Sequence, residues 1–135
     1  VSSLLFEIKA RGFSQILIAD DDPQFRSAWI AILGSSLGSS NISIESFSKL
    51  KDLERSLNRI KAVGSKTLFL IDKDFESAKE TGLQFSRRTL SEYAVVLVTG
   101  ATLDRSLLEA ALTARLPILT KDQIRNFMDN PAKNI

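Results

Sequence analysis

The sequence predicts an α/β fold in which helices cover both faces of a five-stranded parallel sheet. Apolar runs of strand length alternate along the chain with stretches whose apolar residues recur at helical spacing. Two of the runs, in TLFLID and AVVLVT, are almost continuously apolar, as expected of parallel strands that are buried on both faces. Five strand and helix units in series therefore predict a doubly wound (βα)5 sheet.

The first unit begins with a strand at residues 16–19 and continues into a helix. Asp22 and Pro23 supply the N-cap and the first turn of that helix. The residues expected on its buried face are Phe25, Ala28, Trp29, Ile32 and Leu33. Residues 34–41, which are rich in Gly and Ser, are predicted to form a loop.

The second unit looks less buried than the first. Residues 42–47 alternate apolar and polar side chains, which favours a strand near an edge of the sheet. Ser48 is expected to cap the next helix and Gly64 to end it. Its apolar stripe is Leu50, Leu53, Leu57 and Ile60. Its solvated basic face is Lys49, Lys51, Arg55, Arg59 and Lys61.

Two further strands are predicted at residues 67–71 and 94–99. A polar loop to Gly82 and a helix over residues 83–90 separate them. Thr102 is expected to cap the following helix, which bears Leu103, Leu107, Leu108, Ala111 and Leu112.

The fifth strand is short and the chain ends in a helix. Pro117 indicates an edge strand at residues 116–119, because proline cannot donate to a neighbouring strand. The helix over residues 122–129 is expected to bury Ile124, Phe127 and Met128.

Composition narrows the classes of protein to consider. The length of 135 residues suits one domain, and 44% hydrophobic with 25% charged residues is the balance of a globular chain. The absence of Cys and His excludes disulfides, the usual zinc sites and Ser-His-Asp triads. The formal charge is only +2, and the basic residues are scattered along the chain, which gives little support for nucleic-acid binding.

Polar side chains follow the strands at the edge where parallel strands end. Asp20 and Asp21 follow the first strand, Asp72 the third, Thr99 the fourth and Lys121 the fifth. Open α/β sheets bind ligands at this edge. Crowded carboxylates repel one another unless a cation lies among them, and Mg²⁺ prefers such oxygen ligands. Lys121 offers a positive charge for a phosphate. Together, these side chains indicate phosphoryl transfer to an aspartate.

Four short motifs carry a resemblance to a known family: ILIADDDP, TLFLID, VVLVT and LPILTK. Residues 15–135 resemble the receiver domain of two-component response regulators and hybrid sensor histidine kinases, including the expected spacing between Thr99 and Lys121. The resemblance implies a flavodoxin-like sheet with the strand order 2-1-3-4-5.

The resemblance also implies a role for each site residue. Asp72 resembles the aspartate that accepts a phosphoryl group from a phosphohistidine, and Asp21 and Asp20 resemble the Mg²⁺ ligands. The backbone carbonyl of Asp74 lies where the family has another ligand. Thr99 and Lys121 match the hydroxyl and the lysine that meet the phosphoryl group. The expected outcome is a conformational switch, without enzymatic turnover beyond the domain's own phosphorylation and dephosphorylation.

The sequence departs from the family pattern at several positions. Asp122 follows Lys121 where the family usually has proline, and Ile118 replaces an aromatic residue that often rotates on activation. The segment from Asp72 to Gly82 is about two residues longer than usual and lacks a proline. Gly100 replaces a small residue, usually alanine.

Other interpretations of these residues remain open. The three aspartates before Pro23 also suit a helix cap, and Lys121 alone suits a solvated surface position. DKD after an apolar strand resembles the nucleophile motif of haloacid-dehalogenase phosphatases. A pseudo-receiver, which keeps the fold without being phosphorylated, is the other alternative.

Both ends of the chain bear on the kind of protein to which the domain belongs. Residues 1–14 form a lead with Leu4, Leu5 and Ile8 on one helical face. Because the chain begins with Val, we interpret the lead as a linker to a hybrid kinase. The expected partner is a histidine kinase or phosphotransfer protein in the cytoplasm, and a homodimer stays open. One helix after Lys121 leaves no room for a DNA-binding domain. No apolar run is long enough to span a membrane, and no membrane contact by this domain is expected.

Overall fold

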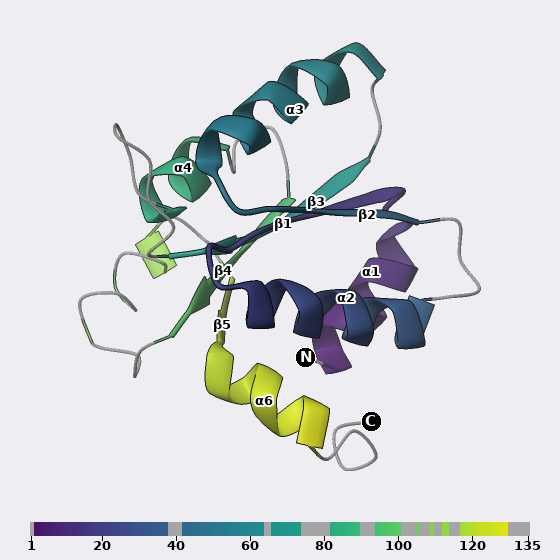
Figure 1. Cartoon of the computed structure of the whole chain (residues 1–135), viewed down its shortest axis with the longest axis vertical. Helices are drawn as coiled ribbons and strands as arrows, with labels where there is room; N and C mark the ends of the chain where they lie inside the picture. The colour runs from purple at the N-terminus through teal and green to yellow at the C-terminus, as the bar shows by residue number, and fades with distance from the viewer. Residues whose placement is uncertain are drawn as a thin grey trace.

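The protein is built on one parallel sheet. The computed structural model describes residues 2–37, 42–63, 66–73, 82–89, 94–100, 105, 109, 112–113 and 117–129. The strands run in the order β2-β1-β3-β4-β5, and all neighbouring pairs are parallel (Figure 1). They are β1 (Gln15–Ala19), β2 (Ser43–Phe47), β3 (Thr67–Asp72), β4 (Ala94–Thr99) and β5 (Ile118–Thr120). The predicted fold class and strand order are confirmed.

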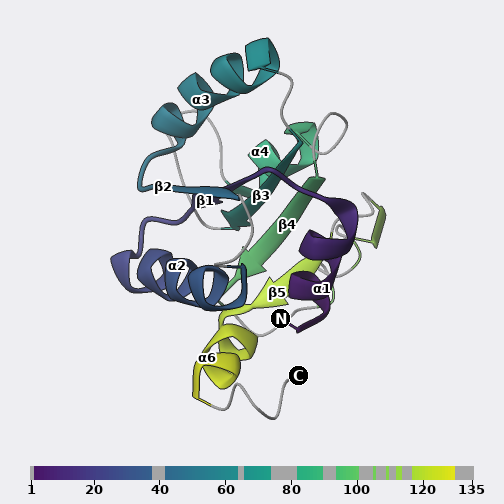
Figure 2. The ribbon, with the colours of Figure 1, turned by 90° about the vertical axis from the view of Figure 1, so that its right-hand side faces the viewer.

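Two helical layers enclose the sheet. α3 (Leu50–Val63) and α4 (Gly82–Thr89) lie over one face (Figure 1). The other face is covered by α1 (Ser2–Arg11), α2 (Pro23–Leu37) and α6 (Lys121–Asp129) (Figure 2). None of the helices in the described residues combines the length and the hydropathy of a membrane-spanning segment.

The core divides into two clusters because successive side chains of a strand point to opposite faces. The strand residues beneath α1, α2 and α6 are Ile16, Ile18, Leu68, Leu70, Val96 and Val98. Those beneath α3 and α4 are Leu17, Ala19, Phe69, Ile71, Val95 and Leu97. Every residue of β3 is buried, which explains its continuous apolar sequence.

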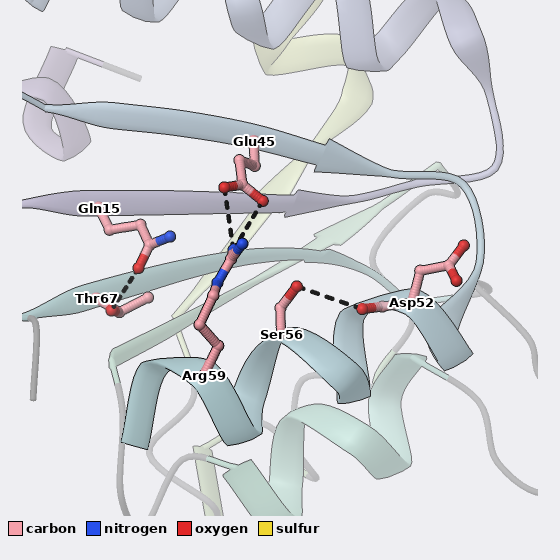
Figure 3. Close-up of polar contacts among 6 residues, drawn as sticks. All are labelled: Gln15, Glu45, Asp52, Ser56, Arg59 and Thr67. Carbon is pink, nitrogen blue, oxygen red and sulfur yellow. Dashed lines mark hydrogen bonds and ion pairs between the residues drawn. The ribbon is translucent and has the colours of Figure 1, made fainter. Parts of the chain in front are cut away.

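β2 is an edge strand that is only partly buried, as predicted. Its Glu45 accepts hydrogen bonds of 3.0 and 3.1 Å from the Arg59 guanidinium of α3 (Figure 3). The Arg59 side chain is 57% exposed, so this ion pair orients α3 over β2 more than it stabilises the fold. The predicted basic face of α3 is confirmed at Lys51, Arg55 and Arg59, and Lys49 is exposed just before the helix, whereas Lys61 lies outside the described side chains.

The segment before β1 is a helix that packs against the sheet. Ile8 is fully buried, Leu5 is nearly so, and Leu4 packs against the same cluster. Gly12 follows the helix with φ of 67°, a left-handed conformation that glycine adopts without steric cost. Side chains of α1 and of β3, β4 and β5 line a cavity of about 400 Å³, which places α1 across these three strands (Figure 2).

α2 is longer than the sequence analysis predicted. The helix runs to Leu37, so the predicted loop was wrong for residues 34–37, and residues 38–41 lie outside the described part. Leu37 follows Leu33 by one turn, and both are buried in the same cluster. Burying the second leucine outweighs the cost of about 1 kcal/mol for a glycine within a helix.

Two apolar side chains of predicted helices are exposed. Ile124 and Phe127 of α6 are buried, but Met128 is 45% exposed, because the three-residue edge strand β5 offers apolar surface to only one row of α6. Leu112 is 76% exposed, since its spacing places it on the face of the exposed Arg105–Glu109 ion pair. The other residues named for that predicted helix lie outside the described residues: Thr102, Leu103, Leu107, Leu108 and Ala111.

Some element boundaries differ from the prediction by one or two residues. The Lys49 carbonyl accepts hydrogen bonds from the amides of Asp52 and Leu53, so Ser48 precedes the N-cap position of α3. Pro117 precedes β5, and its carbonyl accepts a hydrogen bond from the Leu97 amide of β4. The predicted stop of α3 at Gly64 lies outside the described residues.

Candidate functional site

Asp20 lies directly after β1 and is held by backbone hydrogen bonds. Its amide donates to the Phe47 carbonyl at 3.2 Å, and its Oδ1 accepts from the Asp22 amide at 2.9 Å. The Asp22 carboxylate in turn accepts from the Gln24 amide at 2.9 Å, which confirms Asp22 as the N-cap of α2. The side chain of Asp20 is therefore fixed at the carboxyl edge of the sheet, where it is buried.

Asp72 is the last residue of β3 and is also buried. It pairs in register with Val98 of β4, and the Lys73 amide donates to the Val98 carbonyl at 2.7 Å. The alternation along β3 places Asp72 on the same face as Leu68 and Leu70, which is the face covered by α2 and α6. Asp72 therefore lies on the side of the sheet from which Lys121 approaches.

Lys121 is the first residue of α6 and reaches both acids. Its Nζ lies 3.2 Å from Asp20 Oδ2 and 3.8 Å from Asp72 Oδ2. Its side chain is only 11% exposed, and those of the two acids are more buried still. An ammonium shielded from water between two carboxylates is not a solvated surface lysine.

Burial raises the pKa of the Asp20 carboxyl above its usual value, because the charged form loses its solvation. The hydrogen bond from the Asp22 amide and the charge of Lys121 oppose this effect, and the nearby Asp21 charge adds to it. Asp20 is therefore a carboxylate that gains from any additional cation brought to the site.

The acidic cluster suits a divalent cation. One carboxylate oxygen from each of Asp20, Asp21 and Asp72 lies within 4.8 Å of the others. Two oxygens on opposite sides of Mg²⁺ are about 4.2 Å apart, so the three groups fit one ion with a small contraction or an intervening water. Asp21 is exposed, which leaves the cluster open to solvent on one side. Asp74, the fourth predicted ligand, lies outside the described residues.

Thr99 ends β4 at the same edge of the sheet. It is fully buried and pairs in register with Thr120, the residue before Lys121. Its neighbour Val98 pairs with Asp72, so Thr99 extends one residue beyond the acid. Thr99 and Asp72 therefore end neighbouring strands at the same edge of the sheet, and the alternation along β4 places Thr99 on the face of Val95 and Leu97.

The connection from β5 to α6 is a capping box in place of the family's Lys-Pro step. The Thr120 hydroxyl accepts from the Gln123 amide at 3.1 Å, and Gln123 Oε1 accepts from the Thr120 amide at 2.8 Å. Asp122 points to the surface and pairs with Arg125 at 2.8 Å. Lys121 therefore occupies the first helical position with no intervening loop.

The remaining departures from the family pattern have simple packing consequences. Ile118 is half-buried against the cluster beneath α3 and α4, where it fills space without an aromatic ring. A Cβ on Gly100 would lie 3.6 Å from Lys121 Cδ, which is ordinary contact, so the difference from alanine is small. Residues 74–81, where the sequence analysis found two extra residues, lie outside the described part.

Two α2 residues at this site were not predicted from the sequence. Arg26 Nη1 donates to the Asp20 carbonyl at 2.8 Å, which anchors α2 to the end of β1. The Phe25 ring lies beneath Lys121, with Nζ 4.4 Å from the ring centroid. Phe25 was predicted only as a core residue, since nothing in a single sequence shows which face of α2 would meet Lys121.

Comparisons with known proteins identify the fold. No protein-family model matches the sequence, and no curated protein is significantly similar to it. The signal receiver domain of the DNA-binding response regulator merR from Colwellia psychrerythraea 34H matches with a TM-score of 0.65 and 17% identity, over 88% of this chain and 98% of that chain. The CKI1 histidine kinase receiver domain from Arabidopsis thaliana, in complex with Mg²⁺ and BeF₃⁻, matches with a TM-score of 0.61 and 17% identity, over 87% and 85%. A response regulator from Thermotoga maritima matches with a TM-score of 0.59 and 17% identity, over 91% and 98%.

The chain has the receiver-domain fold. Within this receiver fold, Asp20, Asp72 and Lys121 are in contact at the carboxyl edge of the sheet. Asp21 lies within reach of the same cation, and Thr99 ends the neighbouring strand.

Proposed function

We propose that this chain is a phospho-accepting receiver domain of two-component phosphorelay signalling, with Asp72 as the acceptor. The observation that carries the proposal is the contact of Lys121 Nζ with the carboxylates of both Asp20 and Asp72. Asp72 would combine with a phosphoryl group at a position that already has a cation beside it. A helix cap alone does not require this arrangement across three strands.

The transfer forms one bond and breaks one. An Asp72 carboxylate oxygen attacks the phosphorus of a phosphohistidine, and the P–N bond breaks with its electron pair on the histidine nitrogen, which takes up a proton. Lys121 then balances the charge on the phosphoryl oxygens, and the Thr99 hydroxyl donates a hydrogen bond to one of them. The phosphodonor is a histidine kinase or a phosphotransfer protein.

The acidic cluster would hold the metal ion that this reaction needs. Asp20, Asp21 and Asp72, with the backbone carbonyl of Asp74, are the proposed ligands. Mg²⁺ bound there supplies positive charge that offsets the repulsion between the acids and an incoming phosphate. The proposed receiver domain comprises residues 15–135 with α1 packed against its sheet, and its proposed setting is a cytoplasmic hybrid kinase.

Binding of a phosphoryl mimic tests this function without a partner kinase. With Mg²⁺ and beryllofluoride, we expect the amide signals of Asp20, Asp72, Thr99 and Lys121 to shift in NMR spectra, and neither component alone should give the full change. Asp72→Asn removes the carboxylate oxygen that bonds beryllium and should abolish the response. Spectra that ignore beryllofluoride at saturating Mg²⁺ would reject the phospho-acceptor role.

A pseudo-receiver is the second candidate, and the β5–α6 connection favours it. The capping box of Thr120 and Gln123 ties Lys121 into the first turn of α6, where the family usually has a proline. A lysine held in this way suits a static structural ion pair. In that case the protein would bind Mg²⁺ weakly and would show no response to beryllofluoride.

A further inference from the structure

Lys121 has a third contact besides the two acids. Its Nζ lies 4.4 Å from the centroid of the Phe25 ring, within the range of cation–π attraction. Phe25 is 7% exposed, so the contact is shielded from water. Arg125 also lies over this ring, with Cζ 5.0 Å from the centroid, and its own partner is Asp122. One aromatic ring thus lies beneath both cations of the first two turns of α6.

The backbone of Lys121 is fixed independently of that ring. The capping box of Thr120 and Gln123 sets the start of α6, and β5 pairs with β4 up to Thr120. The four-carbon side chain of Lys121 still has several rotamers from this starting point. What selects among them is the surface along which the side chain lies.

Phe25 provides that surface from the opposite element. It follows the Asp22 cap by one helical turn, so the hydrogen bonds that place Asp20 and Asp22 also place the ring. The two carboxylates attract the ammonium from the sheet edge, and the ring supports it from the α2 side. The three contacts together define one position for Nζ.

We propose that Phe25 is a positioning residue that holds the Lys121 ammonium where it meets a phosphoryl group on Asp72. This inference rests on the proposed function. Phe25 acts through the Lys121 ammonium, which meets the phosphoryl group and is not a metal ligand, so the effect of Phe25 should appear in phosphoryl binding and not in Mg²⁺ binding. A role restricted to filling the core would affect neither ligand selectively.

The test compares Phe25→Leu with a matched control. Phe127 has nearly the same exposure, 8%, and belongs to the same core cluster, and Phe127→Leu makes the same change in volume. Isothermal titration calorimetry measures the affinity for Mg²⁺, and then for beryllofluoride at saturating Mg²⁺. We expect Phe25→Leu to weaken beryllofluoride binding about 3-fold to 30-fold, with Mg²⁺ affinity unchanged. Phe25→Tyr keeps the ring and should restore binding, and Phe127→Leu should bind both ligands like the wild type.

The outcomes separate this inference from the proposed function. If the wild type binds beryllofluoride and Phe25→Leu matches Phe127→Leu, the positioning role is wrong and the receiver function stands. Failure of Phe25→Tyr to restore binding would also reject the positioning role. If the wild type does not bind beryllofluoride, both proposals are overturned.

A measurement on the wild type covers the case in which Phe25→Leu does not fold. Protons that lie over an aromatic ring are shifted upfield by its ring current. We expect the Lys121 Cε protons to be shifted upfield in the Mg²⁺-bound protein, and to remain so with beryllofluoride. Random-coil chemical shifts for these protons would show that the ring does not hold the side chain.

Discussion

Lys121 Nζ lies 3.8 Å from Asp72 Oδ2, although the two residues are far apart in the sequence, Asp72 at the end of β3 and Lys121 at the start of α6. Asp20 contacts the same ammonium at 3.2 Å. Lys121 thus brings one positive charge to two buried carboxylates, and the exposed Asp21 adds a further negative charge beside them. Three acids gathered around this ammonium make the corner of the sheet suited to a divalent cation.

Lys121→Met should make folding more dependent on Mg²⁺. Without the ammonium, two buried carboxylates face each other, and we expect the free energy of unfolding to fall by about 3 kcal/mol in metal-free buffer. Mg²⁺ should recover more stability in the variant than it adds to the wild type, because the ion then supplies the positive charge that the Lys121 ammonium provides in the wild type. Urea unfolding with and without Mg²⁺ measures both effects. Lys51→Met removes an exposed lysine of α3 and should leave the Mg²⁺ response as in the wild type. Equal Mg²⁺ responses for Lys121→Met and Lys51→Met would contradict this account.

Asp20→Asn should stabilise the metal-free protein at neutral pH. Burial raises the folded-state pKa of Asp20, so the folded protein binds this proton more tightly than the unfolded chain does. The ionised carboxylate therefore costs stability above the folded-state pKa, and that cost disappears as the pH falls through the raised value to 3.8. The gain from Asp20→Asn should shrink over the same interval in urea unfolding at a series of pH values. A gain that grows as the pH falls would reverse the predicted sign.

Gly82→Ala should disrupt the end of β3. A Cβ at this position would lie 1.8 Å from the Asp72 carbonyl oxygen and 2.9 Å from the Asp72 carbonyl carbon. Because these are backbone atoms, the strand end must move, and we expect a loss of at least about 3 kcal/mol together with weaker Mg²⁺ binding.

Gly34→Ala is the matched control for that substitution. Gly34 lies in α2, and a Cβ there would have nothing within 4 Å. Since alanine favours a helix over glycine, this variant should gain about 0.5–1 kcal/mol in urea unfolding. If Gly82→Ala were as stable as the wild type, the close approach of Gly82 to Asp72 would be wrong.

Ile8→Ala tests whether α1 is part of the folded unit. Ile8 is fully buried, so truncation should cost about 2–5 kcal/mol in the free energy of unfolding. Phe6, which is 70% exposed on the same helix, provides the control, and Phe6→Ala should change stability by less than about 0.5 kcal/mol. Similar small effects for both would indicate that α1 is a detached linker.

The sheet was predictable because its signal is repeated along the chain. Five apolar runs with intervening helical spacing leave few alternatives to a parallel sheet, and β3 and β4 were found almost to the residue. The errors arose where tertiary packing outweighs local preference. Gly34 lies within α2 because Leu37 is buried, and Met128 is exposed because the edge of the sheet is narrow beneath α6.

The site was predictable in its parts but not in its contacts. Parallel order alone brings Asp20, Asp72 and Lys121 to one edge, and the structure places both carboxylates within 4 Å of the Lys121 ammonium. The stacking of Phe25 on Lys121 depends on how α2 and α6 lie relative to each other, which no local pattern encodes. Thr120 and Gln123, in contrast, have the spacing of a capping box, and this signal was present in TKDQ but overlooked.

Transfer of a phosphoryl group to Asp72 is the central claim, and intact-mass spectrometry after treatment with acetyl phosphate and Mg²⁺ tests it most directly. We expect one acid-labile phosphoryl group per chain, which needs Mg²⁺ and is absent from Asp72→Asn. A haloacid-dehalogenase-like phosphatase would instead release many phosphate molecules per chain. A native protein that gains no phosphoryl group, or a gain that persists in Asp72→Asn, would contradict the assignment.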